Sequence, residues 1–176
     1  MMDILDHEVK KKVYDNTIPV LKELAALHGT FVTGSAAVGG FIINDSDINI
    51  VVPIEYRDVD IKAIKIRLQS AGYMLAPSDY NDGFKILKQG QSIPVNVITL
   101  HPFEYCAWLF ATNVLANQET IKDRNARHRA FELACILFKS TNTSGRYVTT
   151  EGASQYFFNH KPREILDIVK QVLAIT

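Results

Sequence analysis

The chain of 176 residues carries 19 basic and 19 acidic residues, so its formal net charge at pH 7 is zero. This length suits one domain with a sizeable buried core, and the balanced charge excludes a strong overall attraction to nucleic acid or to an anionic membrane. No apolar run approaches the ~20 residues that span a bilayer, and Cys106 and Cys135 have no metal-like spacing. We therefore expect a soluble, cytoplasmic protein with free thiols and no membrane partner.

The first hundred residues mix helical and strand patterns. Apolar residues recur at helical spacing over residues 4–27, where Pro19 should kink or divide the helix. A second helix is expected over residues 58–71, capped by Asp58 or Asp60. Strand patterns cover residues 31–33, 45–53, 73–77, 83–90 and 92–100.

From residue 101 onward the patterns are almost entirely helical. Helices are expected at residues 102–117, 118–140, 151–159 and 161–174, with a loop at 140–150. This order predicts an α+β fold with a mixed or antiparallel sheet and a helical C-terminal half. We expect a single domain over residues 1–176, in which residues 1–100 hold the sheet, residues 101–176 are helical, and the active cleft lies between them.

A turn of small residues follows the first expected strand. Gly34 and Ser35, with two alanines after them, leave the backbone N–H groups open to close approach by an anion, and the Ser35 hydroxyl adds a donor. A phosphate group would fit there. Small residues are also ordinary turn chemistry, so the turn by itself does not separate the two interpretations.

Polar side chains line the start of the next strand. Side chains two apart in a strand point to the same face, which predicts that Asp45, Asp47 and Asn49 line up beside the Gly-Ser turn. Two oxygen-rich side chains one pleat apart are suitable ligands for Mg²⁺ when phosphates supply further ligands. Asn96, in the middle of a later strand, is the candidate for a third group at this site.

The signature of the nucleotidyltransferase superfamily that includes DNA polymerase beta is a Gly-Ser turn, eleven intervening residues, and then an Asp, an apolar residue, a second acid and an apolar residue. This chain resembles that signature from Gly34 onward, except that Asn49 stands in place of the second acid. This resemblance implies that Gly34 and Ser35 hold a nucleoside triphosphate and that Asp47 binds Mg²⁺ or Mn²⁺. It also implies transfer of a nucleoside monophosphate to an acceptor. The acceptor class stays open: a small molecule, a tRNA end or a protein.

The chain is further similar to small nucleotidyltransferase-like proteins of bacteriophages and prophages over about residues 30–138. The residues that carry this likeness are Gly83-Phe84, Asn96 to Thr99, Phe103, Trp108, Asp123-Arg124, Arg127 and Phe131. An Asn at the third acidic position is ordinary in that group. An Asn in place of the second acid, as at Asn49, is a departure from the superfamily pattern.

The two amides weaken the expected chemistry. Asn supplies a carbonyl oxygen but no negative charge, and it cannot act as a general base at neutral pH. One way to keep a metal pair is for Asp45 and Asp47 to form it. The candidate catalytic residues are therefore Asp45, Asp47, Asn49 and Asn96, and the candidate metal ligands are Asp45, Asp47 and Asn49.

Three basic residues are further candidates for binding the nucleotide. Arg124 and Arg127 are three apart on one expected helix and could hold phosphates; an ion pair between Asp123 and Arg127 on a solvated face is the alternative. Lys85 lies near the expected hairpin. It either contacts a phosphate or blunts an exposed sheet edge.

Aromatic residues at Phe103, Trp108 and Phe110 either stack on a base or pack in the core. For the whole chain three functions stay open. The first is a nucleotidyltransferase, active or weakly active. The second is a catalytically inactive relative that binds a nucleotide or a partner, and Asp-to-Asn changes made by engineering would give the same sequence. The third is an interaction module in which the acidic residues form a solvated strand entry.

Overall fold

The computed structural model describes residues 4–24, 29–38, 41–42, 44–80, 83–116 and 124–141. The chain divides into two compact units. The first is Met1–Ala36 with Phe41–His101, and the second is Ala37–Gly40 with Pro102–Thr176. The expected helices at residues 151–159 and 161–174, and residues 142–150 of the expected loop, lie outside the described residues.

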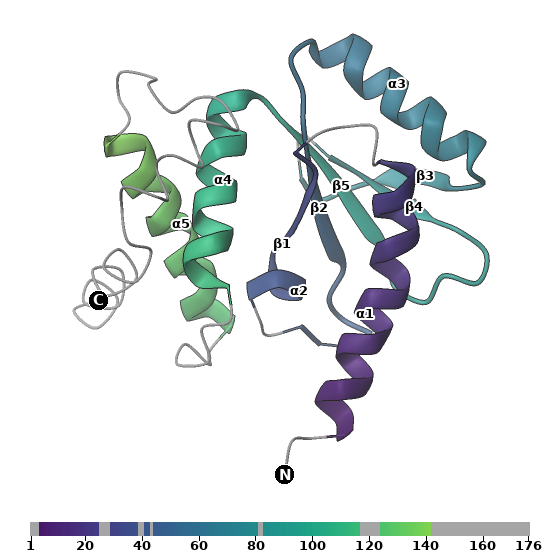
Figure 1. Cartoon of the computed structure of the whole chain (residues 1–176), viewed down its shortest axis with the longest axis horizontal. Helices are drawn as coiled ribbons and strands as arrows, with labels where there is room; N and C mark the ends of the chain where they lie inside the picture. Colours follow the sequence, from purple (N-terminus) through teal and green to yellow (C-terminus); the bar gives the residue numbers. More distant parts are fainter. Residues whose placement is uncertain are drawn as a thin grey trace. The chain divides into compact units, whose positions relative to one another are not determined.

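The first unit is built on a five-stranded sheet (Figure 1). Its strands are β1 (Phe31–Thr33), β2 (Ile48–Pro53), β3 (Met74–Pro77), β4 (Gly83–Leu87) and β5 (Val95–Leu100), in the order β1-β2-β5-β4-β3. The β2 and β5 strands run parallel, whereas the other neighbouring pairs are antiparallel. The expected α+β class with a mixed sheet is therefore confirmed.

One face of this sheet carries the hydrophobic core. Alternate residues of the neighbouring strands β2 and β5, among them Ile48, Ile50 and Val97, are fully buried. They form one core with apolar residues of the helices α1 (Ile4–Glu23) and α3 (Arg57–Ser70). Successive side chains of a strand point to opposite faces. The residues between these core positions, such as Asn49 and Asn96, therefore lie on the other face.

The helix α1 is continuous through Pro19, so the expectation that Pro19 divides it is wrong. Proline removes one backbone donor, and here it lies within the last two turns of the helix. Asn16 anchors α1 to the sheet: its Oδ1 accepts hydrogen bonds from the backbone N–H groups of Ser92 at 3.0 Å and Ile93 at 3.3 Å. Its Nδ2 also donates to the Ser92 hydroxyl at 3.0 Å.

The helix α3 begins at Arg57, so neither Asp58 nor Asp60 is its N-cap residue. Asp60 instead reaches back from the first turn, and its Oδ2 accepts from the backbone N–H groups of Glu55 at 2.9 Å and Tyr56 at 2.8 Å. These bonds satisfy donors that have no partner within the helix. The helix ends at Ser70, and Gly72, with a φ of 94°, closes a Schellman motif directly after the C-cap.

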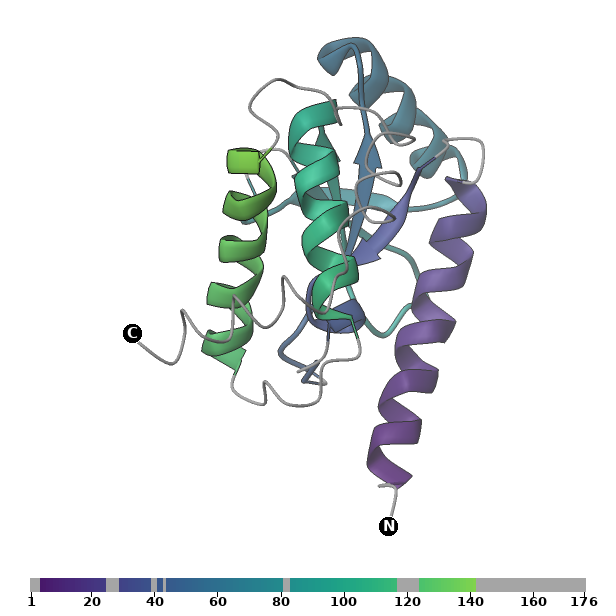
Figure 2. The same cartoon turned by 60° about the vertical axis from the view of Figure 1, so that its left-hand side comes forward.

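The second unit contains α4 (Pro102–Leu115) and α5 (Arg124–Thr141), which run side by side in both views (Figures 1 and 2). Phe138 packs on Phe103 and Phe110, and Trp108 meets Phe131 edge-on at a centroid distance of 5.3 Å. These contacts favour core packing over base stacking for the aromatic stripe. No helix among the described ranges is long and apolar enough to cross a membrane.

Candidate functional site

A row of polar residues crosses the sheet on the face opposite the α1 and α3 core. In the strand register Asn49 of β2 lies opposite Thr33 of β1 and opposite Asn96 of β5, and Asn96 lies opposite Lys85 of β4. Residues opposite each other in neighbouring strands project to the same face. Sequence positions 33, 49, 85 and 96 thus meet in one line.

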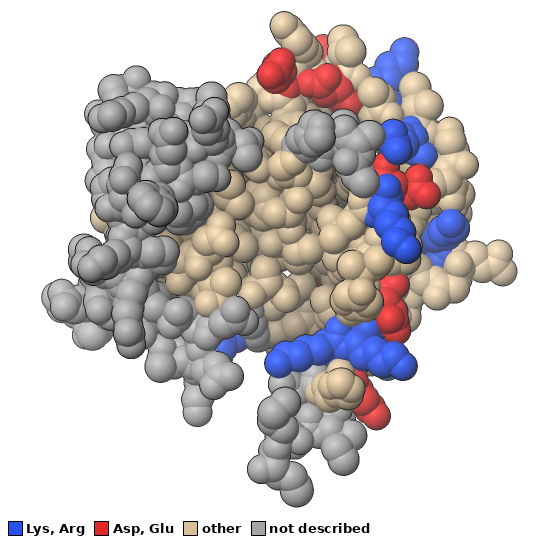
Figure 3. Space-filling view, viewed as in Figure 1, with Lys and Arg blue, Asp and Glu red and all other residues tan. Residues whose placement is uncertain are grey.

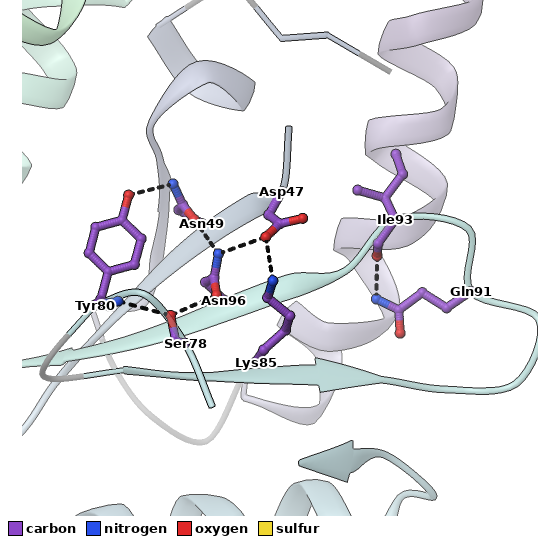
Figure 4. A network of polar contacts seen from close by, with 8 residues as sticks. All are labelled: Asp47, Asn49, Ser78, Tyr80, Lys85, Gln91, Ile93 and Asn96. Atoms are coloured by element: carbon purple, nitrogen blue, oxygen red, sulfur yellow. Dashed lines mark hydrogen bonds and ion pairs between the residues drawn. The ribbon is translucent and has the colours of Figure 1, made fainter. Parts of the chain in front are cut away.

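The amide groups of this row are linked by hydrogen bonds (Figure 4). Asn96 Nδ2 donates to Asn49 Oδ1 at 3.0 Å, and Asn49 Nδ2 donates to the hydroxyl oxygen of Tyr80 at 3.2 Å. Ser78 Oγ in turn donates to Asn96 Oδ1 at 2.8 Å. Both amide oxygens are therefore already acceptors within the protein, which fixes the orientation of both amides.

Asp47 adds a charge at one end of the row. Its Oδ2 lies 2.9 Å from the ammonium nitrogen of Lys85, and each of the two side chains is 26 % exposed. Asn96 Nδ2 also approaches the same oxygen, at 3.4 Å. The hydrogen bond to Asp47 raises the pKa of Lys85 above its usual value, against an opposing effect of burial. Lys85 is thus held as an ammonium ion.

The Gly-Ser turn lies against the same amide row. Gly34 has a φ of +68°, and a Cβ built on it would lie 2.7 Å from Nδ2 of Asn49. Ser35 follows at once, half-buried, as the first residue of the short helix α2 (Ser35–Val38). The structure therefore brings the turn and the second strand together, as the sequence motif predicts.

Asp45 stands apart from the strand. The strand begins at Ile48, and Asp45 is exposed in the preceding turn. The prediction that Asp45 shares a strand face with Asp47 and Asn49 is therefore wrong, because Asp45 is not in the strand. Ser46 explains the turn: it is buried, its hydroxyl accepts from Ile42 N at 3.0 Å, and its own N–H donates to Ile42 O at 2.8 Å. Ser46 therefore holds the turn that precedes the strand.

Lys85 does not blunt a sheet edge. Its strand, β4, lies between β5 and β3, so both edges of the strand are paired. That alternative is therefore wrong, and Lys85 belongs to the candidate site through Asp47.

Arg124 and Arg127 belong to α5 of the second unit. Their role in binding nucleotide stays a prediction.

Ser78 and Tyr80 belong to the site but are absent from the sequence-based candidates. Both lie in the connection between β3 and β4. Because β3 pairs antiparallel with β4, this connection lies near the row of polar residues that contains Lys85. Burial raises the pKa of the Tyr80 hydroxyl, and the nearby carboxylates of Asp47 and Asp79 add to the rise, while the bond from Asn49 lowers it. The sequence signal that could have indicated Ser78 and Tyr80 is the short run of turn residues between two strand patterns.

The superfamily resemblance implies a divalent metal, and the donor set here tests that implication. Mg²⁺ takes oxygen ligands, chiefly carboxylates and phosphates. Among the described residues no group of three or more His, Cys, Asp or Glu side chains could hold a metal ion. The carboxylate of Asp47 already pairs with Lys85, and the oxygens of Asn49 and Asn96 already accept hydrogen bonds.

A metal ion on Asp47 would also face a fixed positive charge. The ammonium of Lys85 would repel the cation and would have to leave Asp47 before the carboxylate could bind a metal. The residues therefore do not fit a metal site in this arrangement.

No family model matches this chain, and no curated protein matches it. Similar solved structures include two of Cid1 poly(U) polymerase, one a mutant bound to MgATP (TM-score 0.45) and one bound to MgGTP (TM-score 0.44). Each is 13 % identical and matches 78 % of this chain but only 43 % and 42 % of the Cid1 chains. This chain thus spans less than half the length of those chains.

The conserved protein GrpB from Enterococcus faecalis is a third similar structure. It has a TM-score of 0.41 and 11 % identity, and the match covers 90 % of each chain. Because all these likenesses are weak, we argue the function from the residues of the site.

Proposed function

We propose that this protein binds a nucleoside triphosphate on the polar face of its sheet, with transfer of the nucleotidyl group weak or absent. The phosphates lie at Gly34 and Ser35, beside the amide row. The observation that carries the proposal is the hydrogen bond from Asn96 Nδ2 to Asn49 Oδ1, 3.0 Å long. It joins two neutral amides where the resemblance implies two acids.

The amide pair favours binding over turnover. Nucleotidyl transfer depends on metal ions that neutralise phosphate charge and on a base that activates the attacking group. One hydrogen bond joins Asn49 and Asn96, but neither amide adds the negative charge that a carboxylate ligand would give to a metal ion. Neither amide can accept a proton at neutral pH. What stays suited to a nucleotide is the small-residue turn, whose backbone a phosphate can approach closely.

Binding is tested by calorimetric titration of ATP, GTP, CTP and UTP, each with Mg²⁺ and separately with EDTA. At least one nucleotide should bind the wild-type protein. Ser35→Glu places a carboxylate where the phosphates lie and should abolish that binding through charge repulsion. Ser70→Glu, on an exposed position at the end of α3, adds the same charge away from the site and should leave binding unchanged. Absence of binding by all four nucleotides would refute the proposal.

Transfer is tested separately with α-labelled nucleotide. Wild-type protein should label no acceptor, or label it slowly, when small molecules, tRNA and protein are offered in turn. The double variant N49D/N96D restores both acids of the motif and should label faster if the lost acids are what limits turnover. Rapid labelling by the wild-type protein would show instead that Asp47, with Asp45 or another group, suffices for an active nucleotidyltransferase.

A further inference from the structure

The ion pair between Lys85 and Asp47 lies where the resemblance implies a metal ion. Lys85 belongs to β4, and its side chain passes over β5 to reach a carboxylate just before β2 (Figure 4). A lysine side chain loses much rotamer freedom when it is held in one place. Here the 2.9 Å contact with Asp47 holds it on the polar face of an inner strand rather than in solvent.

The pair also sets the charge of the site. Within the hydrogen-bonded network Asp47 and Lys85 cancel, and the other side chains (Asn49, Ser78, Tyr80, Asn96) carry no charge at neutral pH, while the carboxylate of Asp79 lies close to Tyr80 and Lys85. A typical metal site without its metal is strongly negative and repels phosphate until the cation arrives. This site carries its own cation, so a polyphosphate can approach without a metal to neutralise surplus carboxylates.

The ammonium reaches, through Asp47, the start of the strand whose Asn49 lies against the Gly34 turn. Its partner Asp47 directly precedes β2, and the amide of Asn49, two residues later on β2, touches the Gly34 turn. Lysine is a compact point charge with three donors, so one ammonium can serve a carboxylate and a phosphate oxygen together.

We propose that Lys85 takes the place of the metal ion, so that the site binds the polyphosphate of a nucleotide without a divalent cation. This inference rests on the nucleotide site proposed above. The ammonium of Lys85 balances Asp47 in the empty site and donates to a phosphate oxygen in the occupied one. No bond is made or broken in this step.

The nucleotide titration tests the inference by comparing EDTA with Mg²⁺. With the nucleotide that binds most tightly, wild-type affinity should be similar in both buffers. Lys85→Met should lose about tenfold or more in EDTA, because a charge-assisted hydrogen bond to phosphate is lost. Lys85→Arg keeps the charge and should retain binding. Lys88→Met removes the lysine that lies over the Tyr73 ring and should bind as wild type does.

Asp47→Ala separates the two roles of the carboxylate. If Asp47 is a metal ligand, the variant loses binding in Mg²⁺. If Lys85 is the cation, the variant keeps binding in EDTA, because the ammonium is still present and a negative charge has been removed. Circular dichroism of each variant checks that the fold is intact.

A direct metal titration gives an answer that needs no nucleotide. Mn²⁺ binding followed by electron paramagnetic resonance should show no site on the wild-type protein that depends on Asp47, and a new weak site in Lys85→Met. Wild-type Mn²⁺ binding that disappears in Asp47→Ala would overturn the inference while leaving the nucleotide site standing. So would nucleotide binding that requires Mg²⁺. Failure of every nucleotide in both buffers would overturn the inference together with the proposed function.

Discussion

At the scale of single residues, Gly34 meets two independent requirements at once. Its φ of +68° lies in the left-handed region that residues with a Cβ avoid, and the space where a Cβ would lie is taken by the amide of Asn49. The positive φ is required by the turn, and the absence of a Cβ is required by the position of the Asn49 amide. Glycine is therefore needed for the backbone path and for the position of Asn49.

A pair of substitutions separates these requirements. Gly90 also has a positive φ, +86°, but a Cβ there meets nothing within 4 Å. Gly90→Ala should cost about 1–2 kcal/mol of stability from the backbone alone. Gly34→Ala should cost more, because Asn49 must move, and it should also weaken nucleotide binding. Urea unfolding and nucleotide titration measure both effects, and equal losses of stability would show that the Asn49 contact is easily relieved.

At the scale of elements, the position of α1 depends on one buried amide. Asn16 is 8 % exposed, and it bonds to Ser92 and Ile93 in the connection between β4 and β5. These hydrogen bonds join residues that are 76 and 77 positions apart in the sequence. These bonds fix the helix against the same connection that leads into the Asn96 strand.

Asn16→Ala should therefore be strongly destabilising. It leaves the backbone donors of Ser92 and Ile93 without this acceptor, and we expect a loss of about 2–3 kcal/mol. Asn113→Ala is the matched control, since Asn113 is an exposed helical residue whose Nδ2 donates to Leu109 O at 2.9 Å. The control should change stability by less than about 0.5 kcal/mol. Chemical unfolding measures both, and a loss as small as the control's would show that water replaces the missing amide.

At the scale of the whole molecule, charge and ionisation set how the protein responds to its solvent. The formal net charge is zero and the pI is about 7.0. Figure 3 shows basic and acidic side chains interleaved over α1 and α3 rather than gathered by sign. The described part of this face therefore presents no patch of a single charge to a nucleic-acid backbone.

Two thiols whose pKa is raised in the folded protein predict a loss of folding stability at high pH. Burial raises the pKa of the thiols to about 11 for Cys106 and about 12 for Cys135, from 9.0. Above about pH 9 the unfolded chain loses these protons while the folded chain keeps them, so folding stability falls as pH rises. The slope approaches about 1.4 kcal/mol per pH unit for each thiol.

Urea unfolding at several pH values from 8 to 11 measures this slope. The double variant C106A/C135A should show a shallower fall than the wild-type protein. The comparison uses slopes, so any packing loss from the alanines cancels. Tyr80 also has a raised pKa and contributes in the same direction, so some fall should persist in the variant. Identical slopes in the two proteins would contradict the prediction.

The sequence by itself determined the elements and the chemical composition of the site. Alternation predicted β2 and β4, β-branched residues predicted β5, and helical periodicity predicted α3, α4 and α5. The small-residue turn with Asp47 and Asn49 gave the candidate site, which stays a prediction. These signals are local, because each depends on neighbours within a few positions. Strand alternation failed at Asp45, because a local turn held by hydrogen bonds between Ser46 and Ile42 keeps Asp45 out of the strand.

Only the tertiary structure decided which side chains meet. The pairing of β2 with β5 sets Asn49 beside Asn96, and the order of the strands carries Lys85 to Asp47. The connection after β3 adds Ser78 and Tyr80. Register and strand order are fixed by contacts between distant segments, which no single stretch of sequence contains. For that reason the sequence predicted an acidic metal site, whereas the fold places an ammonium ion on its aspartate.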